Sequence, residues 1–107
     1  MTSEGEARLE RAAFEAATGT TFAVHAGDGA PVLLTLAEVD VLPAPEGWEC
    51  FALLFDGPGP ALPQWTYRVE HATIGAFPLF LGPVAGGGAG LRYEAVFNRQ
   101  APDSAAD

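Results

Sequence analysis

Residues 51–84 read FALLFDGPGPALPQWTYRVEHATIGAFPLFLGPV, and after a glycine run residues 91–99 read LRYEAVFNR. Apolar and polar side chains alternate through much of these segments, and clusters of Gly and Pro separate them. Alternation with a period of two is typical of β-strands, and Gly/Pro clusters supply the turns that join them. The stretch therefore predicts successive antiparallel strands.

The same pattern extends toward the N-terminus. The apolar phase slips by one residue between Leu36 and Val39, which predicts a β-bulge near Ala37 and Glu38. Counted over the whole chain, six strands are predicted, over residues 21–26, 32–41, 48–55, 64–71, 77–84 and 91–98.

Two of these strands, 48–55 and 77–84, are apolar on both faces. A strand of this kind needs a cover on each side, and the barrel interior can supply only one. The N-terminal helix or another protein surface must supply the second. Pro78 and Pro83 cannot donate ladder hydrogen bonds, so strand 77–84 is expected at an edge or a bulge.

One helix is predicted before the strands, over residues 6–17, because Ser3 and Glu6 match a capping box and good helix formers follow. Its apolar face is thin, with Leu9 and Phe14 as the main contacts. The fold class that results is mainly β: a small antiparallel six-stranded barrel or sandwich with one N-terminal α-helix. Residues 6–99 are expected to form a single β-rich domain between a disordered N-terminus, 1–5, and a disordered acidic tail, 100–107.

Composition excludes several classes of partner. The 107 residues include 14 Asp and Glu against 5 Arg and no Lys, for a net charge of −9. Binding of phosphates depends on clustered Lys and Arg, so neither nucleic acid nor an anionic membrane is an expected partner. No stretch approaches the roughly 20 apolar residues of a membrane span, and the polar start lacks the layout of a secretion signal, so a cytoplasmic protein is expected.

The titratable residues do not predict a metal centre or a cofactor. The two imidazoles, His25 and His71, would need Glu70 or Glu94 to complete a zinc site. Glu70 and His71 are adjacent on a strand and so point to opposite faces, which makes them a poor chelating pair.

Catalysis is equally weakly indicated. Cys50 paired with either histidine is conceivable as a nucleophile, but no basic neighbour lowers its pKa, so a buried inert thiol is favoured. The carboxylate pairs Glu38/Asp40 and Glu46/Glu49 are best interpreted as a solvated acidic face. No catalytic residue is predicted.

Aromatic residues are the strongest candidates for contact with a partner, because Trp and Tyr concentrate binding energy at interfaces. The leading hypothesis is a non-enzymatic interaction or assembly module that binds another protein or its own copies. The alternative is a small-ligand-binding or enzymatic barrel that uses Tyr67, Glu70 and His71 at its mouth, which an internal cavity would favour. The candidate partner-binding residues are Trp48, Trp65, Tyr67, Phe77 and Phe80.

Four blocks of the chain resemble an uncharacterised bacterial family of small β-rich domains: LTLAEV at 34–39, FALLFDGP at 51–58, LPQWTYRVEHATIGAFPLFLGPV at 62–84 and YEAVFNR at 93–99. The family pattern is F-x-L-L-F-x-G-P, then L-P-Q-G-T-Y, then Y-E-A-x-F-N, and this chain has Trp65 where relatives often have Gly. The resemblance covers about residues 20–99 and implies no activity or catalytic residue. Some relatives resemble products encoded beside phage-tail-like proteins, which implies a role in a protein assembly.

Overall fold

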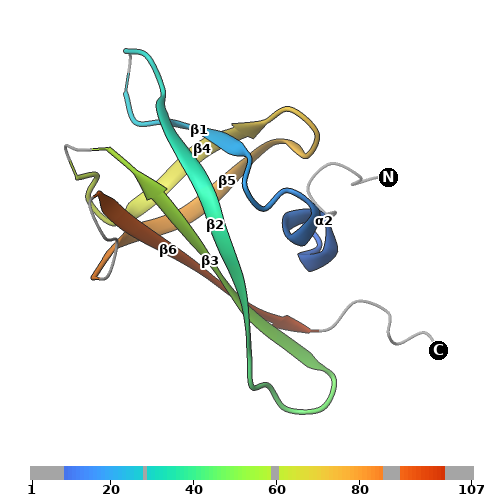
Figure 1. Ribbon diagram of the computed structural model, residues 1–107. Helices are drawn as coiled ribbons and strands as arrows, with labels where there is room; N and C mark the ends of the chain where they lie inside the picture. The colour runs from blue at the N-terminus through green and yellow to red at the C-terminus, as the bar shows by residue number, and fades with distance from the viewer. Residues whose placement is uncertain (1–8, 28, 59–60, 86–89, 101–107) are drawn as a thin grey trace.

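The computed structural model describes residues 9–27, 29–58, 61–85 and 90–100. Within them the strands form a closed barrel in the order β1-β2-β3-β6-β5-β4, with every neighbouring pair antiparallel (Figure 1). The mainly β class is thus confirmed, and of the two architectures expected the chain adopts the barrel. The elements are α2 (Arg11–Ala16), β1 (Thr21–His25), β2 (Val32–Leu42), β3 (Trp48–Gly57), β4 (Trp65–His71), β5 (Gly75–Val84) and β6 (Leu91–Gln100).

The predicted bulge in β2 is confirmed. The register between β2 and β3 shifts between Leu36 and Glu38, so that Leu36 pairs with Phe55 and Glu38 pairs with Leu54. The extra residue keeps apolar side chains on the inner side of the sheet both before and after the slip.

The strands pair over very different lengths. β3 and β6 pair along their whole lengths, from Trp48 with Gln100 to Gly57 with Leu91. By contrast, β1 meets β4 at only three residue pairs, and β5 meets β6 at only three. We call these two short ladders the β1–β4 seam and the β5–β6 seam. The β4–β5 hairpin is therefore held to the remaining strands by two short seams (Figure 1).

The expectation of an edge position for residues 77–84 is confirmed over only part of the strand, because β5 pairs with β6 at Gly82–Val84 alone. It pairs with β4 from Gly75 to Leu81 and with β6 from Gly82 to Val84. Over Gly75–Leu81, however, β4 is the only strand neighbour among the described residues. Pro78 lies in that part, so its missing N–H need not remove a ladder hydrogen bond.

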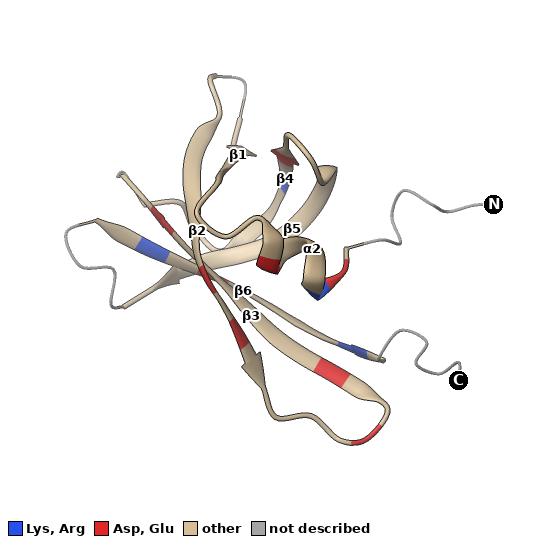
Figure 2. Cartoon of the chain, turned by 45° about the vertical axis from the view of Figure 1, so that its right-hand side comes forward, with Lys and Arg blue, Asp and Glu red and all other residues tan. Residues whose placement is uncertain are grey.

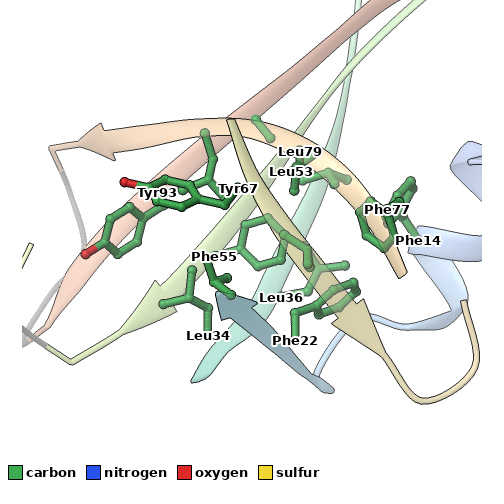
Figure 3. Close-up of a cluster of buried hydrophobic side chains, with 14 of the residues drawn as sticks. Phe14, Phe22, Leu34, Leu36, Leu53, Phe55, Tyr67, Phe77, Leu79 and Tyr93 are labelled. Carbon is green, nitrogen blue, oxygen red and sulfur yellow. The ribbon is translucent and has the colours of Figure 1, made fainter. Parts of the chain in front are cut away.

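Apolar side chains of all six strands fill the barrel (Figure 3). Six of the larger apolar residues share one phase of the alternation in their strands, and this phase predicts that they are buried together. Phe97 is only partly buried and packs against the core. The other five lie in the core, each no more than 6% exposed: Val24, Phe51, Leu53, Phe55 and Tyr67.

Helix α2 closes one end of the barrel, between the parts of β5 and β6 that do not pair. It begins at Arg11 with Glu10 as the N-cap, later than predicted, and the predicted cap Ser3 and helical residues 6–8 lie outside the described residues. Phe14 is fully buried, and its ring lies 5.6–6.4 Å, centroid to centroid, from four rings on four different strands: Phe22, Phe51, Phe77 and Phe97.

The second apolar face of β5 is exposed rather than covered. Helix α2 packs on the inner side, where Phe14 contacts Phe77, while Phe80 on the outer side is 55% exposed. On the outer side of β3, Ala52 is buried but Cys50 is only half-buried, so the prediction of a core thiol is wrong. Helix α2 therefore does not supply the second cover expected for β5. Within the described ranges, no helix has the length and apolar character needed to cross a bilayer.

Candidate functional site

Two tyrosines occupy the end of the barrel opposite α2, and their hydroxyls are already engaged. The Tyr93 hydroxyl accepts a hydrogen bond from the Leu62 amide at 3.0 Å, and the Tyr67 hydroxyl donates to the Pro63 carbonyl oxygen. Burial raises the pKa of Tyr67, with a smaller contribution from the charge of Tyr93. Both hydroxyls therefore anchor the loop before β4, and the barrel interior beside them is packed with side chains (Figure 3).

His71 fixes the turn between β4 and β5. Its Nδ1 accepts hydrogen bonds from the amides of Thr73 and Ile74 at 3.1 and 3.2 Å, so Nδ1 carries no proton. The proton lies on Nε2, which donates to Thr20 Oγ1 at 2.8 Å, and that hydroxyl donates to the Ala17 carbonyl oxygen. Burial lowers the pKa of His71, consistent with this neutral tautomer. The imidazole acts as a structural bridge, with both nitrogens occupied.

Glu70 belongs to a different cluster. Its Oε1 lies 3.0 Å from His25 Nε2, and its Oε2 lies 2.9 Å from Arg68 Nη2. His25 and Arg68 are opposite each other in the β1–β4 seam. The cluster is partly exposed, and it stabilises the seam on its outer side.

The three residues of the ligand-binding hypothesis thus do not converge on one cavity. Glu70 and His71 border an open depression of about 460 Å³ on β1, β4 and β5, while Tyr67 borders a separate one of about 380 Å³. A third depression, of about 400 Å³, lies between α2 and the β4–β5 turn and also includes His71.

The nucleophile and metal hypotheses find no matching cluster. Cys50 has Leu42 and Asn98 as its cross-strand neighbours, and neither histidine is among them. Within residues 9–27, 29–58, 61–85 and 90–100, no group of three or more His, Cys, Asp or Glu side chains is placed to hold a metal ion.

The five candidate partner-binding residues divide into two sets. Tyr67 and Phe77 are 6% and 5% exposed because their side chains face the barrel interior, so we exclude them from the candidate surface. Trp48, Trp65 and Phe80 are exposed, with Trp65 at 67%.

Trp65 and Phe80 belong to neighbouring rungs of the same ladder, in which Trp65 pairs with Leu81 and Thr66 pairs with Phe80. Trp65 shares the inward phase of the buried Leu81, so it lies on the opposite side of the hairpin from Phe80. We call the outward side chains of this hairpin the β4–β5 face. The depression of about 380 Å³ lies on this face. Its members are Thr66, Arg68, Pro78 and Phe80.

The sheet made by β2, β3 and β6 is acidic (Figure 2). In residues 32–57 and 90–100 there are six carboxylates and two arginines. Both arginines are engaged: Arg92 forms two hydrogen bonds with Asp56, at 2.8 and 3.0 Å, and Arg99 forms one with Glu49 at 2.9 Å. The Asp56 pairing lowers the pKa of that carboxyl and raises that of Arg92. Glu38, Asp40 and Glu46 are exposed, as a solvated acidic face requires, but the Glu49 side chain is only 15% exposed and binds Arg99.

Comparison with known proteins gives a family and nothing more. Neither the search of curated proteins nor the search of solved structures found a match. A family model described as "Domain of unknown function (DUF6916)" matches residues 9–97, which span helix α2 and nearly all of the barrel. The chain accordingly belongs to the DUF6916 family of domains of unknown function.

Proposed function

We propose that this domain is a non-enzymatic protein-interaction module, and that the β4–β5 face is a surface through which it binds. One observation carries the proposal: Phe80, an outward side chain of the β4–β5 ladder, is 55% exposed while the interior beneath it is filled. Large aromatic side chains on a rigid surface bind a partner at little cost in conformational entropy.

The chemistry of the polar side chains supports the same proposal. The hydroxyls of Tyr67 and Tyr93, both nitrogens of His71 and the carboxylate of Glu70 all have partners within the domain. A ligand or substrate would have to displace these contacts, whereas a protein partner can bury Phe80 without disturbing them.

The test is a charge placed at the centre of the β4–β5 face, with a matched control elsewhere. Phe80→Asp changes an outward residue of β5 that is 55% exposed, and Leu33→Asp changes a residue of β2 with the same exposed fraction. Both variants should remain folded by circular dichroism. Proteins that co-purify with the tagged wild type should be lost with Phe80→Asp and retained with Leu33→Asp.

Loss of partners by both variants, or by neither, would contradict the role of the β4–β5 face. Light scattering of the wild type and of Phe80→Asp then separates a partner protein from a second copy, since only self-association changes the molar mass of the purified domain. We propose a multiprotein assembly in the cytoplasm as the setting, of which a phage-tail-like particle is the example that the family resemblance implies.

A further inference from the structure

In the part of the chain that the structure describes, the β2 strand has a free edge beyond its bulge. From Glu38 to Leu42 it pairs with β3 alone, and the last contact on its other side is the hydrogen bonding of Leu36 with Gly19 and Thr20. No described residue pairs with the backbone groups that face away from β3 in this segment. Unpaired strand edges are templates on which an extended chain can add.

Side chains alternate strictly along this edge. Glu38 and Asp40 project from the outer side of the sheet and are exposed. Val39 and Val41 project from the inner side, and Val41 is 54% exposed because it lies beyond the end of the barrel. An added strand would therefore meet carboxylates on one of its faces and apolar groups on the other.

Among the described residues neither carboxylate of the edge forms an ion pair, although the charge of Glu38 contributes to the raised pKa of Arg92. Arg92 and Arg99, the two arginines of the β2–β3–β6 sheet, bind Asp56 and Glu49. No described arginine or histidine forms an ion pair with Glu38 or Asp40. The free edge therefore attracts positive charge, at a spacing that matches every second residue of a strand.

We propose that the free edge of β2, Glu38–Leu42, binds an extended segment of a partner protein in which Lys or Arg alternates with Val, Ile or Leu. The partner pairs with the β2 backbone, places its basic side chains beside Glu38 and Asp40, and places its apolar side chains beside Val39 and Val41. This inference rests on the proposed interaction function, but it names a second surface and the chemistry of what binds there.

Charge also selects against a second copy as the occupant. Two β2 edges joined by a two-fold axis would bring Glu38 and Asp40 of one copy beside the same residues of the other. Like charges on neighbouring strands are destabilising, and acidic edge residues are one means by which proteins prevent pairing with their own kind.

The experiment uses two capped peptides of about ten residues and identical composition, one with Lys and Val alternating and one with the lysines and valines in two blocks. Binding to the whole domain is measured by fluorescence anisotropy over a series of salt concentrations. The alternating peptide should bind at least about tenfold more tightly, because only it can satisfy the ladder and both faces together. Hydrogen exchange should slow, on binding, at the amides of Glu38–Leu42 that face away from β3.

Variants locate the contact. The double substitution Glu38→Lys with Asp40→Lys should weaken binding of the alternating peptide by about tenfold, since each pair turns from attractive to repulsive. Glu46→Lys with Glu15→Lys makes the same change in net charge away from the edge and should have little effect. Equal losses in the two double variants, or equal affinity for the two peptides, would show attraction to overall charge and overturn the inference. A wild-type dimer that the edge variant disrupts would also overturn it.

The two proposals fail in different ways. If Phe80→Asp abolishes partner binding while the edge variant binds the partner and both peptides as the wild type does, the β4–β5 face stands and the β2 edge falls. If the edge variant alone loses binding, the inference stands and the β4–β5 face falls.

Discussion

His71 Nε2 lies 2.8 Å from Thr20 Oγ1, which joins the β4–β5 turn to the segment that connects α2 with β1. Because Nδ1 of the same ring accepts two backbone amides, a second proton on the ring would remove an acceptor that this turn uses. The contact thus depends on the neutral ring.

The free energy of unfolding should therefore fall in mild acid. Burial lowers the pKa of His71 in the folded state below its ordinary value of 6.5, so the unfolded state binds a proton first as pH falls. The contribution is fully present above pH 6.5 and is lost between pH 6.5 and the lower folded pKa. Urea denaturation at several pH values across this window should show that the free energy of unfolding of the wild type falls as pH falls. His71→Gln should remove this pH dependence, whereas His25→Gln should keep it.

Phe14 should be one of the most important single side chains of the fold. Its ring contacts four strands and is fully buried, so Phe14→Ala should cost about 3–5 kcal/mol in urea denaturation. The matched change Phe80→Ala removes the same group from the surface and should cost less than about 1 kcal/mol. Similar losses in the two variants would mean that α2 does not close the barrel in solution.

The Tyr93 hydroxyl should contribute more to stability than the Tyr67 hydroxyl. Tyr93→Phe leaves the buried Leu62 amide without its acceptor, at a cost of about 1–3 kcal/mol. Tyr67→Phe frees the carbonyl oxygen of Pro63, an exposed residue that water can reach, so its cost should be smaller. Thermal unfolding of both variants tests the order, and a larger loss for Tyr67→Phe would contradict it.

Gly57, at the end of β3, should not accept a side chain. A Cβ there would lie 2.2 Å from Leu34 Cδ2, which is itself fully buried and has little room to move. Gly57→Ala should therefore cost about 1–3 kcal/mol. Gly27→Ala is the control, because nothing lies within 4 Å of a Cβ placed at Gly27 and the φ of Gly27 is not positive. The free energy of unfolding of this variant should stay within about 1 kcal/mol of the wild-type value. Equal effects would mean that the end of β3 yields more readily than its packing indicates.

Period-two alternation predicted the strands well because it is a local property. Each predicted range agrees with the structure to within about three residues at either end, and the bulge near Glu38 followed from the slip in phase alone. Strand order was not predictable, since it depends on pairings such as Phe51 with Phe97 that are distant in sequence.

Surface features were predicted less well, because periodicity cannot tell whether an apolar face meets a protein or water. Cys50 was expected to be buried and is only half-buried. Phe80 was expected to be covered by the helix or by a partner, and the helix does not cover it. The structural role of His71 was also hidden, since its bond to Thr20 spans 51 residues. The free edge of β2 had one visible signal, the alternation of Glu38 and Asp40 with valines. Only the pairing register shows that no described strand other than β3 lies beside this part of β2.

The β4–β5 hairpin, residues 65–84, should open at a lower free energy than the rest of the barrel, because only two short seams hold it. Each seam joins only three residue pairs, so releasing the hairpin breaks far fewer ladder bonds than separating β3 from β6. Native-state hydrogen exchange should show it opening as a cooperative unit at a lower free energy than global unfolding. A hairpin that detaches as a unit can also pair with the barrel of another copy whose own hairpin has detached. High protein concentration and mild denaturant should therefore favour domain-swapped dimers that exchange this hairpin.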